Sequence, residues 1–176
     1  MKRIVVIGPE STGKSTLCQQ LADHYKTVWC PEYARAYLLE KGMDYHYEDL
    51  GHIAKGQLAL QASVEAQAQN DLYFIDTDMY VMKVWNEVAF EACPAWILKT
   101  IAQTSCDLYL LCNTDLPWTK DELREYPDLK MRQRLFNMYK DIVINSGIPW
   151  LVISGTNEER LHRAISAVDA ITKPNN

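Results

Sequence analysis

The chain has 176 residues, of which 48% are hydrophobic and 23% charged, and its formal net charge is −5. This length predicts one domain, residues 1–176, with a core enclosed between a sheet and flanking helices. The negative net charge argues against a nucleic-acid partner and against an anionic membrane surface, because both require clustered Lys and Arg side chains.

The number and spacing of the cysteines, together with the hydropathy of the chain, indicate the cellular compartment of the protein. The five cysteines are odd in number and have no C-x-x-C spacing, which is typical of free thiols in a reducing cytosol. No apolar run approaches the roughly 18 residues of a membrane-spanning helix. We therefore expect a soluble cytoplasmic protein, and association into a homo-oligomer is left open by the sequence.

Short apolar runs alternate with helical patterns along the chain. The runs have the length of buried parallel strands, and apolar residues recur at helical spacing between them. This alternation predicts a three-layer α/β/α fold with a five-stranded parallel sheet. The expected strands are 4–7, 27–30, 72–75, 108–112 and 150–154.

The first expected strand runs directly into a glycine-rich loop, residues 8–15, which matches G-x-x-x-x-G-K-[ST] in full. Between a strand and a helix, the backbone N–H groups of such a loop and the helix dipole surround a phosphate chain. The loop predicts a P-loop NTPase that uses ATP and Mg²⁺. The expected ATP-binding residues are Gly8, Glu10, Ser11, Thr12, Gly13, Lys14, Ser15 and Thr16.

Each residue type in the loop suits one part of this chemistry. Gly8 and Gly13 allow positive φ and a close approach to phosphate. Lys14 is expected to reach the β- and γ-phosphate oxygens as a catalytic charge, and the Ser15 hydroxyl to ligate Mg²⁺. Thr16 is expected to support the α-phosphate.

An acidic residue follows the second expected strand at Glu32, after Pro31. Phosphoryl transfer to a hydroxyl needs a carboxylate that orients this hydroxyl and accepts its proton, and Glu32 is a candidate for that role. Alternatively, Glu32 opens the helix that carries Arg35, since acidic residues are common in a first turn. Arg35 then either contacts the substrate or lies in solvent.

Asp76 and Asp78 follow the third expected strand. Asp76, at the end of an apolar run, is expected to be the metal-binding acid that acts together with Ser15. The alternative for Asp76 is an N-cap of the next helix, but Asp78 is better placed for capping.

Residues 113–128 interrupt the regular alternation with two prolines, an arginine and a capping-box pattern at 119–122. They follow a strand end, where ligands bind in open α/β sheets. We expect a lid segment that carries Arg124 over the phosphates; the alternative is a solvated surface loop.

The C-terminal part predicts a helix that ends at 145–147 and a second one that opens with the capping box at 156–159. The loop between the last strand and this helix, including Asn157, is the expected adenine edge. Residues 112–115 read Cys-Asn-Thr-Asp and so lack the lysine of the Asn-Lys-x-Asp guanine motif, which disfavours GTP.

Four segments together resemble a known family. They are 8–16 (the P-loop), 32–35 (Glu-Tyr-Ala-Arg), 74–78 (Phe-Ile-Asp-Thr-Asp) and 113–118 (Asn-Thr-Asp-Leu-Pro-Trp). With them the chain resembles, over nearly its whole length, the ribosylnicotinamide kinase domain of the bifunctional NAD-biosynthesis regulators of bacteria. The P-loop is common to many ATPases, whereas the other three segments are much more specific.

The resemblance implies transfer of the ATP γ-phosphate to the 5′-hydroxyl of nicotinamide riboside. It implies that Glu32 or Asp76 orients this hydroxyl and that Arg124 steadies the transferring phosphoryl group. It places the riboside against a small set of residues. These substrate residues are Glu32, Tyr33, Arg35 and Asp78, and the candidates for stacking on the cationic ring are Tyr80, Trp85 and Trp118, with core packing as the alternative for Trp85.

Two other functions fit the same residues. One is a P-loop kinase for another nucleoside, a nucleoside monophosphate or a small hydroxyl compound, because fold and catalytic logic would be unchanged. The other is an ATP-dependent regulatory switch, which would hydrolyse ATP slowly until a partner accelerates it.

Overall fold

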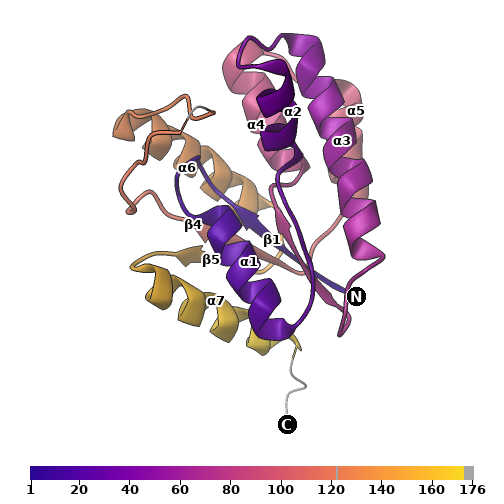
Figure 1. Ribbon diagram of the computed structural model, residues 1–176, viewed down its shortest axis with the longest axis vertical. Helices are drawn as coiled ribbons and strands as arrows, with labels where there is room; N and C mark the ends of the chain where they lie inside the picture. The colour runs from indigo at the N-terminus through magenta and orange to yellow at the C-terminus, as the bar shows by residue number, and fades with distance from the viewer. Residues whose placement is uncertain (122, 173–176) are drawn as a thin grey trace.

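The computed structural model describes residues 1–121 and 123–172. Its strands form one parallel sheet in the order β2-β3-β1-β4-β5 (Figure 1). The expected five-stranded parallel sheet is therefore confirmed, with boundaries within two residues of those predicted. The strands are β1 (Lys2–Ile7), β2 (Trp29–Cys30), β3 (Leu72–Asp76), β4 (Leu108–Cys112) and β5 (Trp150–Ile153).

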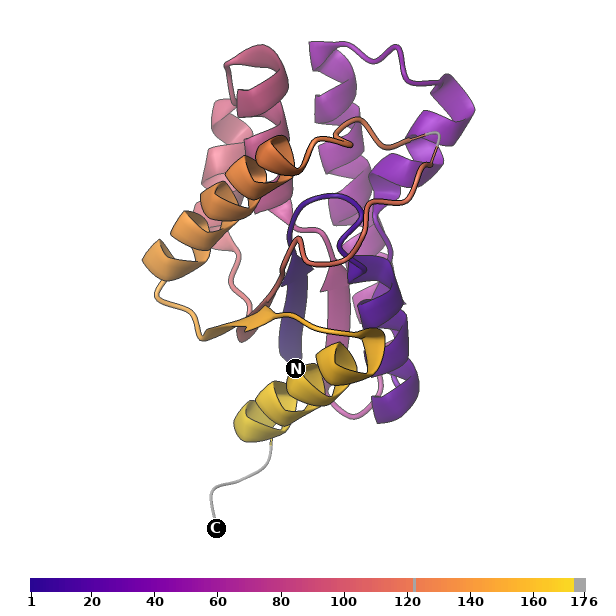
Figure 2. The same ribbon diagram turned by 90° about the vertical axis from the view of Figure 1, so that its left-hand side faces the viewer.

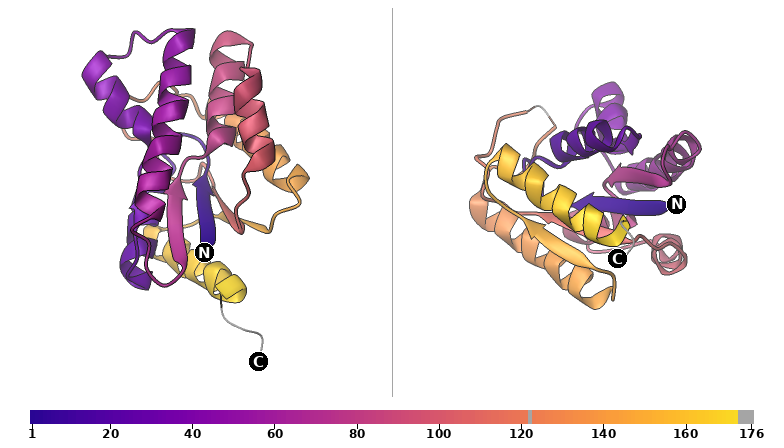
Figure 3. Two further views of the ribbon diagram at one scale, coloured as in Figure 1. Left: turned by 90° about the vertical axis from the view of Figure 1, so that its right-hand side faces the viewer. Right: turned by 90° about the horizontal axis from the view of Figure 1, so that it is seen from below.

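Helices cover both faces of the sheet, as the alternating pattern predicts. On one face α1 (Lys14–Tyr25) and α7 (Asn157–Thr172) pack against alternate residues of the strands, such as Ile4 and Phe74. On the other face lie α4 (Met79–Phe90) and α6 (Leu129–Asn145), which contact Val5 and its neighbours. Figure 3 shows β5 held between α6 and α7. The residues facing the two layers alternate because side chains of a strand point to opposite faces.

A third apolar cluster lies among four helices beside the sheet. It joins α2 (Tyr33–Lys41), α3 (Tyr47–Glu65), α4 and α5 (Ala95–Gln103), which stand together in Figure 1. Ile53 and Ile97 are completely buried in this cluster. These four helices, called the helical group below, extend past the carboxyl edge of the strands and so make one side of a depression at that edge.

The segment 113–128 joins β4 to α6 and, among its described residues, contains no helix. The capping box expected at 119–122 includes a residue outside the described ones. Figure 2 shows this segment crossing beside the loop that follows β1. No helix in the described part of the chain is long and apolar enough to cross a membrane.

Candidate active site

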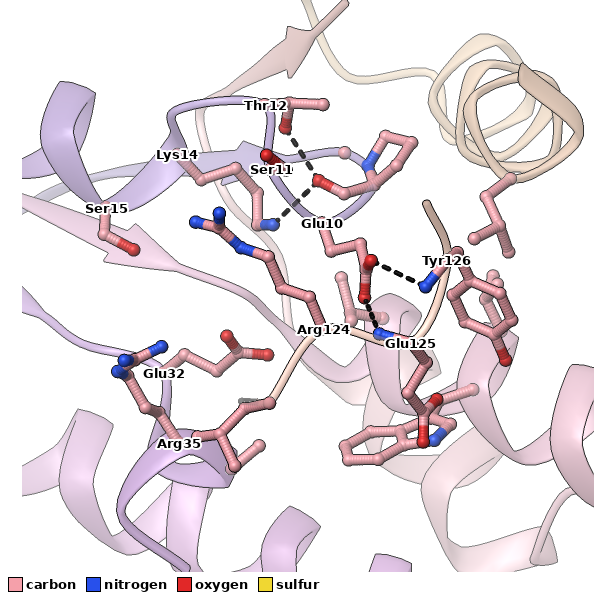
Figure 4. Close-up of a pocket in the computed structure, with 18 of the residues that line it drawn as sticks. Glu10, Ser11, Thr12, Lys14, Ser15, Glu32, Arg35, Arg124, Glu125 and Tyr126 are labelled. Carbon is pink, nitrogen blue, oxygen red and sulfur yellow. Dashed lines mark hydrogen bonds between the residues drawn. The ribbon is translucent and has the colours of Figure 1, made fainter. Parts of the chain in front are cut away.

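The loop between β1 and α1 has the geometry of a phosphate-binding loop. Gly13 has φ of 78° and Gly8 has φ of 147°, and a Cβ atom at Gly8 would lie 2.8 Å from the carbonyl oxygen of Cys112. Both positions therefore require glycine. The Thr12 hydroxyl donates to the Pro9 carbonyl at 2.7 Å, and Lys14 Nζ donates to the same oxygen at 3.1 Å (Figure 4). The loop thus curls around the side chain of Lys14.

Asp76 lies beneath this loop at the end of β3. Its Oδ2 accepts a hydrogen bond from Ser15 Oγ at 2.5 Å, and its side chain is fully buried. Burial raises the pKa of Asp76, while the charge of Lys14 and the bonds from Ser15 and Thr77 oppose this rise. A buried carboxylate beside a serine hydroxyl provides the oxygen ligands that Mg²⁺ prefers. The structure therefore brings the two expected metal ligands together.

A strained residue separates Asp76 from Asp78. Thr77 has φ of 78°, which is unusual for a β-branched residue and is often found at functional sites. The turn sends Asp78 away from the P-loop: its Oδ1 accepts from the Tyr80 amide at 2.9 Å and its Oδ2 from the Tyr109 hydroxyl at 2.8 Å. The expected capping role of Asp78 is confirmed.

Asp78 lines a second, smaller cavity of about 180 Å³, between β1, β3 and the helical group. The structure does not bring it to the P-loop cavity, so the expectation of a ribose contact is not supported by its position. The physical reason is that one carboxylate oxygen caps the N-terminus of α4 and the other accepts from the Tyr109 hydroxyl of β4. Tyr80 lines the same second cavity and packs edge-on against Tyr109.

The E-Y-x-R segment is divided between cavity and core. Glu32 lines the P-loop cavity, and burial raises its pKa while the charge of Lys14 lowers it. Arg35 lines the cavity too, but its guanidinium binds Asp121 of the lid segment at 3.1 Å. Tyr33 is not among the lining residues, because its ring packs against Gly56 of α3. A direct substrate contact is thus compatible with Glu32 and not with Tyr33.

The P-loop cavity has a volume of about 370 Å³, in the range of small-ligand sites. Its polar end is the P-loop with Glu32 and Arg124. Its other end is apolar and aromatic, with contributions from the helical group, α6 and the lid segment. The residues of this second end include Leu38, Met43, Val81, Val84, Trp85, Val88, Leu123, Tyr126, Leu135 and Tyr139.

Glu10 connects the P-loop to the lid segment. Its carboxylate accepts hydrogen bonds from Trp118 Nε1 at 3.1 Å, from the Glu125 amide at 2.9 Å and from the Tyr126 amide at 2.7 Å. Figure 4 shows the Arg124 side chain pointing toward Lys14. The lid residue Arg124 therefore stands over the phosphate-binding loop, as expected, while Trp118 binds Glu10 and is absent from the lining of the cavity.

Two buried arginines support the P-loop from behind, and no sequence motif indicated either of them. Arg160 of α7 donates to the carbonyls of Thr12 and Gly155, both at 2.9 Å, and pairs with Asp115. Arg132 of α6 donates to the carbonyl of Ser11 at 3.5 Å. Both arginines are only 3% exposed. Helix periodicity does not distinguish such an arginine from one that faces solvent.

The loop expected to form the adenine edge does not line the P-loop cavity. Asn157 is the first residue of α7, is exposed and does not line the cavity. The capping box beside it is present, because Glu159 Oε2 accepts from the Thr156 amide at 2.7 Å and the Glu159 amide donates to Thr156 Oγ1 at 3.4 Å. The position of Asn157 therefore serves the start of a helix rather than the cavity.

A family profile described as an AAA domain matches residues 3–160, which includes the P-loop, both strand-end acids and the lid segment. The chain belongs to the AAA domain family. The matched residues contain the P-loop, Asp76 and residues from all five strands of the sheet.

Among curated proteins, the chain is similar to NadR from two bacteria. The AAA domain is 26% identical over 155 residues to the trifunctional NAD biosynthesis/regulator protein NadR of Salmonella typhimurium. It is 25% identical over 173 residues to NadR of Escherichia coli. These alignments cover 86% and 96% of the chain but only 38% and 42% of the relatives. The chain thus spans less than half the length of the curated relatives that it matches.

Solved structures agree with this similarity. A NadR crystal structure with NAD and AMP-PNP matches 99% of the chain and 50% of its own length, with 25% identity and a TM-score of 0.81. A NadR structure in complex with NR matches with a TM-score of 0.80 at 24% identity, covering 99% of this chain and 51% of that one. Thymidylate kinase from Ehrlichia chaffeensis matches with a TM-score of 0.68 at 13% identity, covering 95% and 98%. The expected P-loop kinase fold and the expected family resemblance are confirmed.

Proposed function

We propose that this AAA domain is an ATP-dependent kinase that phosphorylates the 5′-hydroxyl of nicotinamide riboside, giving nicotinamide mononucleotide. The observation that carries the proposal is one cavity that joins the P-loop to an aromatic chamber, with Glu32 beside Lys14 and Arg124 above them. The similarity to NadR, which has been crystallised with NR and with AMP-PNP, supports the choice of both substrates.

The donor side of the reaction belongs to the P-loop and the lid segment. Backbone N–H groups of residues 10–16 bind the β-phosphate, and Lys14 and Arg124 bring positive charge to the γ-phosphoryl group. Charge builds on the equatorial oxygens of this group during transfer. The two cations lower the barrier because they are fixed in place before the reaction begins.

Ser15 and Asp76 would hold Mg²⁺. Their oxygens lie 2.5 Å apart, and among the described residues no cluster of three or more His, Cys, Asp or Glu forms a protein-only metal cage. One hydroxyl and one carboxylate suit an ion that takes its remaining ligands from phosphates and water. When bound there, Mg²⁺ would neutralise negative charge on the phosphates of ATP.

Glu32 is the proposed base on the acceptor side. Asp76 is engaged with Ser15, whereas no hydrogen bond is found for the Glu32 carboxylate among the described residues. Burial raises the pKa of Glu32, and a raised pKa makes a carboxylate a better proton acceptor near neutral pH. Glu32 would orient the 5′-hydroxyl and take its proton as the new O–P bond forms, while the bond from the γ-phosphorus to the β,γ-bridging oxygen breaks and ADP leaves.

The direct test is phosphorylation by the purified protein with MgATP. The acceptors are nicotinamide riboside, uncharged ribosides, nucleoside monophosphates and no acceptor, with product identified by mass spectrometry. We expect phosphate on nicotinamide riboside and little ATP hydrolysis without it. Transfer only to another acceptor would replace the substrate but keep the kinase, and hydrolysis that needs no acceptor would favour the regulatory switch.

A further inference from the structure

Glu125 is a lid residue that lines the aromatic end of the cavity. In Figure 4 its side chain points away from Lys14, whereas the side chain of the preceding residue, Arg124, points toward it. Adjacent residues of an extended segment alternate in direction. The lid segment therefore presents a positive charge to the donor end of the cavity and a negative charge to the acceptor end.

A shared tyrosine connects Glu125 to the aromatic wall. The Tyr45 hydroxyl donates to Glu125 Oε2 at 3.2 Å and accepts from Trp85 Nε1 at 2.9 Å. Both Trp85 and Glu125 line the cavity. The indole face and the carboxylate are thereby fixed relative to each other by one hydroxyl, across the boundary between the helical group and the lid segment.

The charge of Glu125 is not balanced by the protein. No ion pair among the described residues includes it. Burial raises its pKa, the bond from Tyr45 opposes the rise and the negative charge of Glu10 adds to it. The other two carboxylates of the cavity differ: Glu10 accepts three hydrogen bonds, and Glu32 lies in the field of Lys14.

A carboxylate without an ion-pair partner, beside an aromatic face, suits a flat cation. A cationic ring gains from the indole quadrupole and from the carboxylate at once, and its charge complements a carboxylate that is exposed and forms no ion pair among the described residues. We propose that Glu125 determines acceptor specificity by charge, selecting a riboside with a cationic base over the same riboside with an uncharged base. This inference rests on the proposed riboside kinase function.

The position of Glu125 also depends on the donor site. Its backbone amide donates to Glu10 Oε2 at 2.9 Å, so the P-loop itself holds the residue in place. The residue that selects the cation therefore belongs to a lid segment that is hydrogen-bonded to the ATP-binding loop. An acceptor recognised by Glu125 lies in the same cavity as the P-loop.

The test compares two acceptors that differ in charge. Nicotinamide riboside carries a pyridinium cation, and its 1,4-dihydro form has the same sugar and carboxamide but no charge. For Glu125→Gln we expect kcat/KM with the cationic riboside to fall about 10- to 100-fold, mostly through KM. With the uncharged riboside we expect a change below about threefold, because only the charge pairing is lost.

Glu87→Gln is the matched control. Glu87 lies on α4, pairs with Lys83 and is absent from the cavity lining, so its neutralisation should leave both acceptors unchanged. Equal losses on both acceptors in Glu125→Gln would overturn the inference, because they would show a residue that only holds the lid in place. No effect on either acceptor would overturn it as well. If the unaltered protein phosphorylates neither riboside, the proposed function itself fails.

Discussion

Lys14 is the residue on which the donor chemistry depends most directly. It emerges from the first turn of α1 and its Nζ is held by the Pro9 carbonyl inside the P-loop. We expect Lys14→Ala to lower kcat at least about 100-fold, because a fixed cation no longer stabilises the transferring phosphoryl group. Steady-state assay of MgATP with nicotinamide riboside measures this. Unchanged turnover in a folded variant would remove Lys14 from the mechanism.

Gly56 shows a packing requirement that the sequence conceals. A Cβ atom there would lie 2.1 Å from Cε1 of Tyr33, whereas one at Gly51 of the same helix would meet nothing within 4 Å. We expect Gly56→Ala to lower the free energy of unfolding by about 1–3 kcal/mol through overpacking. Gly51→Ala should raise it by about 0.5–1 kcal/mol through helix propensity. Urea denaturation measures both, and equal effects at the two sites would contradict the close packing of Tyr33.

Asp78 should make stability depend on pH with a defined sign. Burial raises its pKa from 3.8 to about 6, so the folded state binds this proton more tightly than the unfolded state does. The gain in stability is absent above both pKa values and grows as the pH falls through 6 toward 4. Asp78→Asn keeps an acceptor for the Tyr80 amide, since Asn also caps helices well, but cannot take up the proton.

The measurement is the difference in unfolding free energy between the unaltered protein and Asp78→Asn. From pH 7 to pH 5 this difference should rise by about 1 kcal/mol in favour of the unaltered protein. Contributions from the other carboxyl groups occur in both proteins and cancel. A difference that does not vary with pH would show that the carboxyl of Asp78 is not desolvated.

At the scale of elements, α7 stabilises the P-loop through Arg160. This arginine joins the Thr12, Asn113 and Gly155 carbonyls, from three separate loops, at 2.9–3.1 Å. We expect Arg160→Met to lower the free energy of unfolding by about 2–4 kcal/mol, because buried carbonyls lose their donors. The KM for ATP should rise as the P-loop loosens. Denaturation and ATP titration measure the two effects.

Arg163 supplies the control for Arg160. It lies one turn further along α7 and is exposed, so Arg163→Met should change the free energy of unfolding by no more than about 0.5 kcal/mol. Comparable losses in both variants would indicate that any arginine on α7 matters for general reasons. Such a result would remove the specific connection between α7 and the P-loop.

The elements themselves differ in how well the sequence predicts them. The strands are predictable because each is a short apolar run that must be buried on both faces. α5 was not predicted, although Trp96, Ile97 and Ile101 face the same apolar cluster, because the helix has only nine residues and so short a segment gives little helical periodicity. Asp78 was correctly predicted as a cap from its position, because capping depends on local hydrogen bonds.

At the scale of the whole molecule, the sequence predicts which strand ends carry polar residues. It does not predict which of these residues face the P-loop cavity and which face another part of the fold. The P-loop, Ser15 and Asp76 meet as expected, because parallel strands deliver their carboxyl ends to one edge. The separation of Asp76 from Asp78 depends on the positive φ of Thr77. The roles of Glu125 and Tyr45 depend on a contact between residues 80 positions apart. No local pattern contains either fact.

The position of the lid segment across the molecule depends on Glu10, and this leads to a prediction about motion. Three hydrogen bonds reach its carboxylate from Trp118, Glu125 and Tyr126. Within the described part of the chain, Ser11 Oγ accepts one, from the Thr119 amide at 3.1 Å. Bonds to a charged acceptor are worth about 1.5–3 kcal/mol each. Glu10→Ala should therefore detach the second half of the lid segment.

Hydrogen exchange tests this detachment residue by residue. In Glu10→Ala we expect the amides of Glu125 and Tyr126 to exchange about 10- to 100-fold faster, since local opening now costs less free energy. In Ser11→Ala only the amide of Thr119 should accelerate. Phosphoryl transfer should fall more in Glu10→Ala, because Arg124 and Glu125 lose their positions together. Exchange at Glu125 and Tyr126 that stays slow without the Glu10 carboxylate would mean that other contacts hold the lid segment closed.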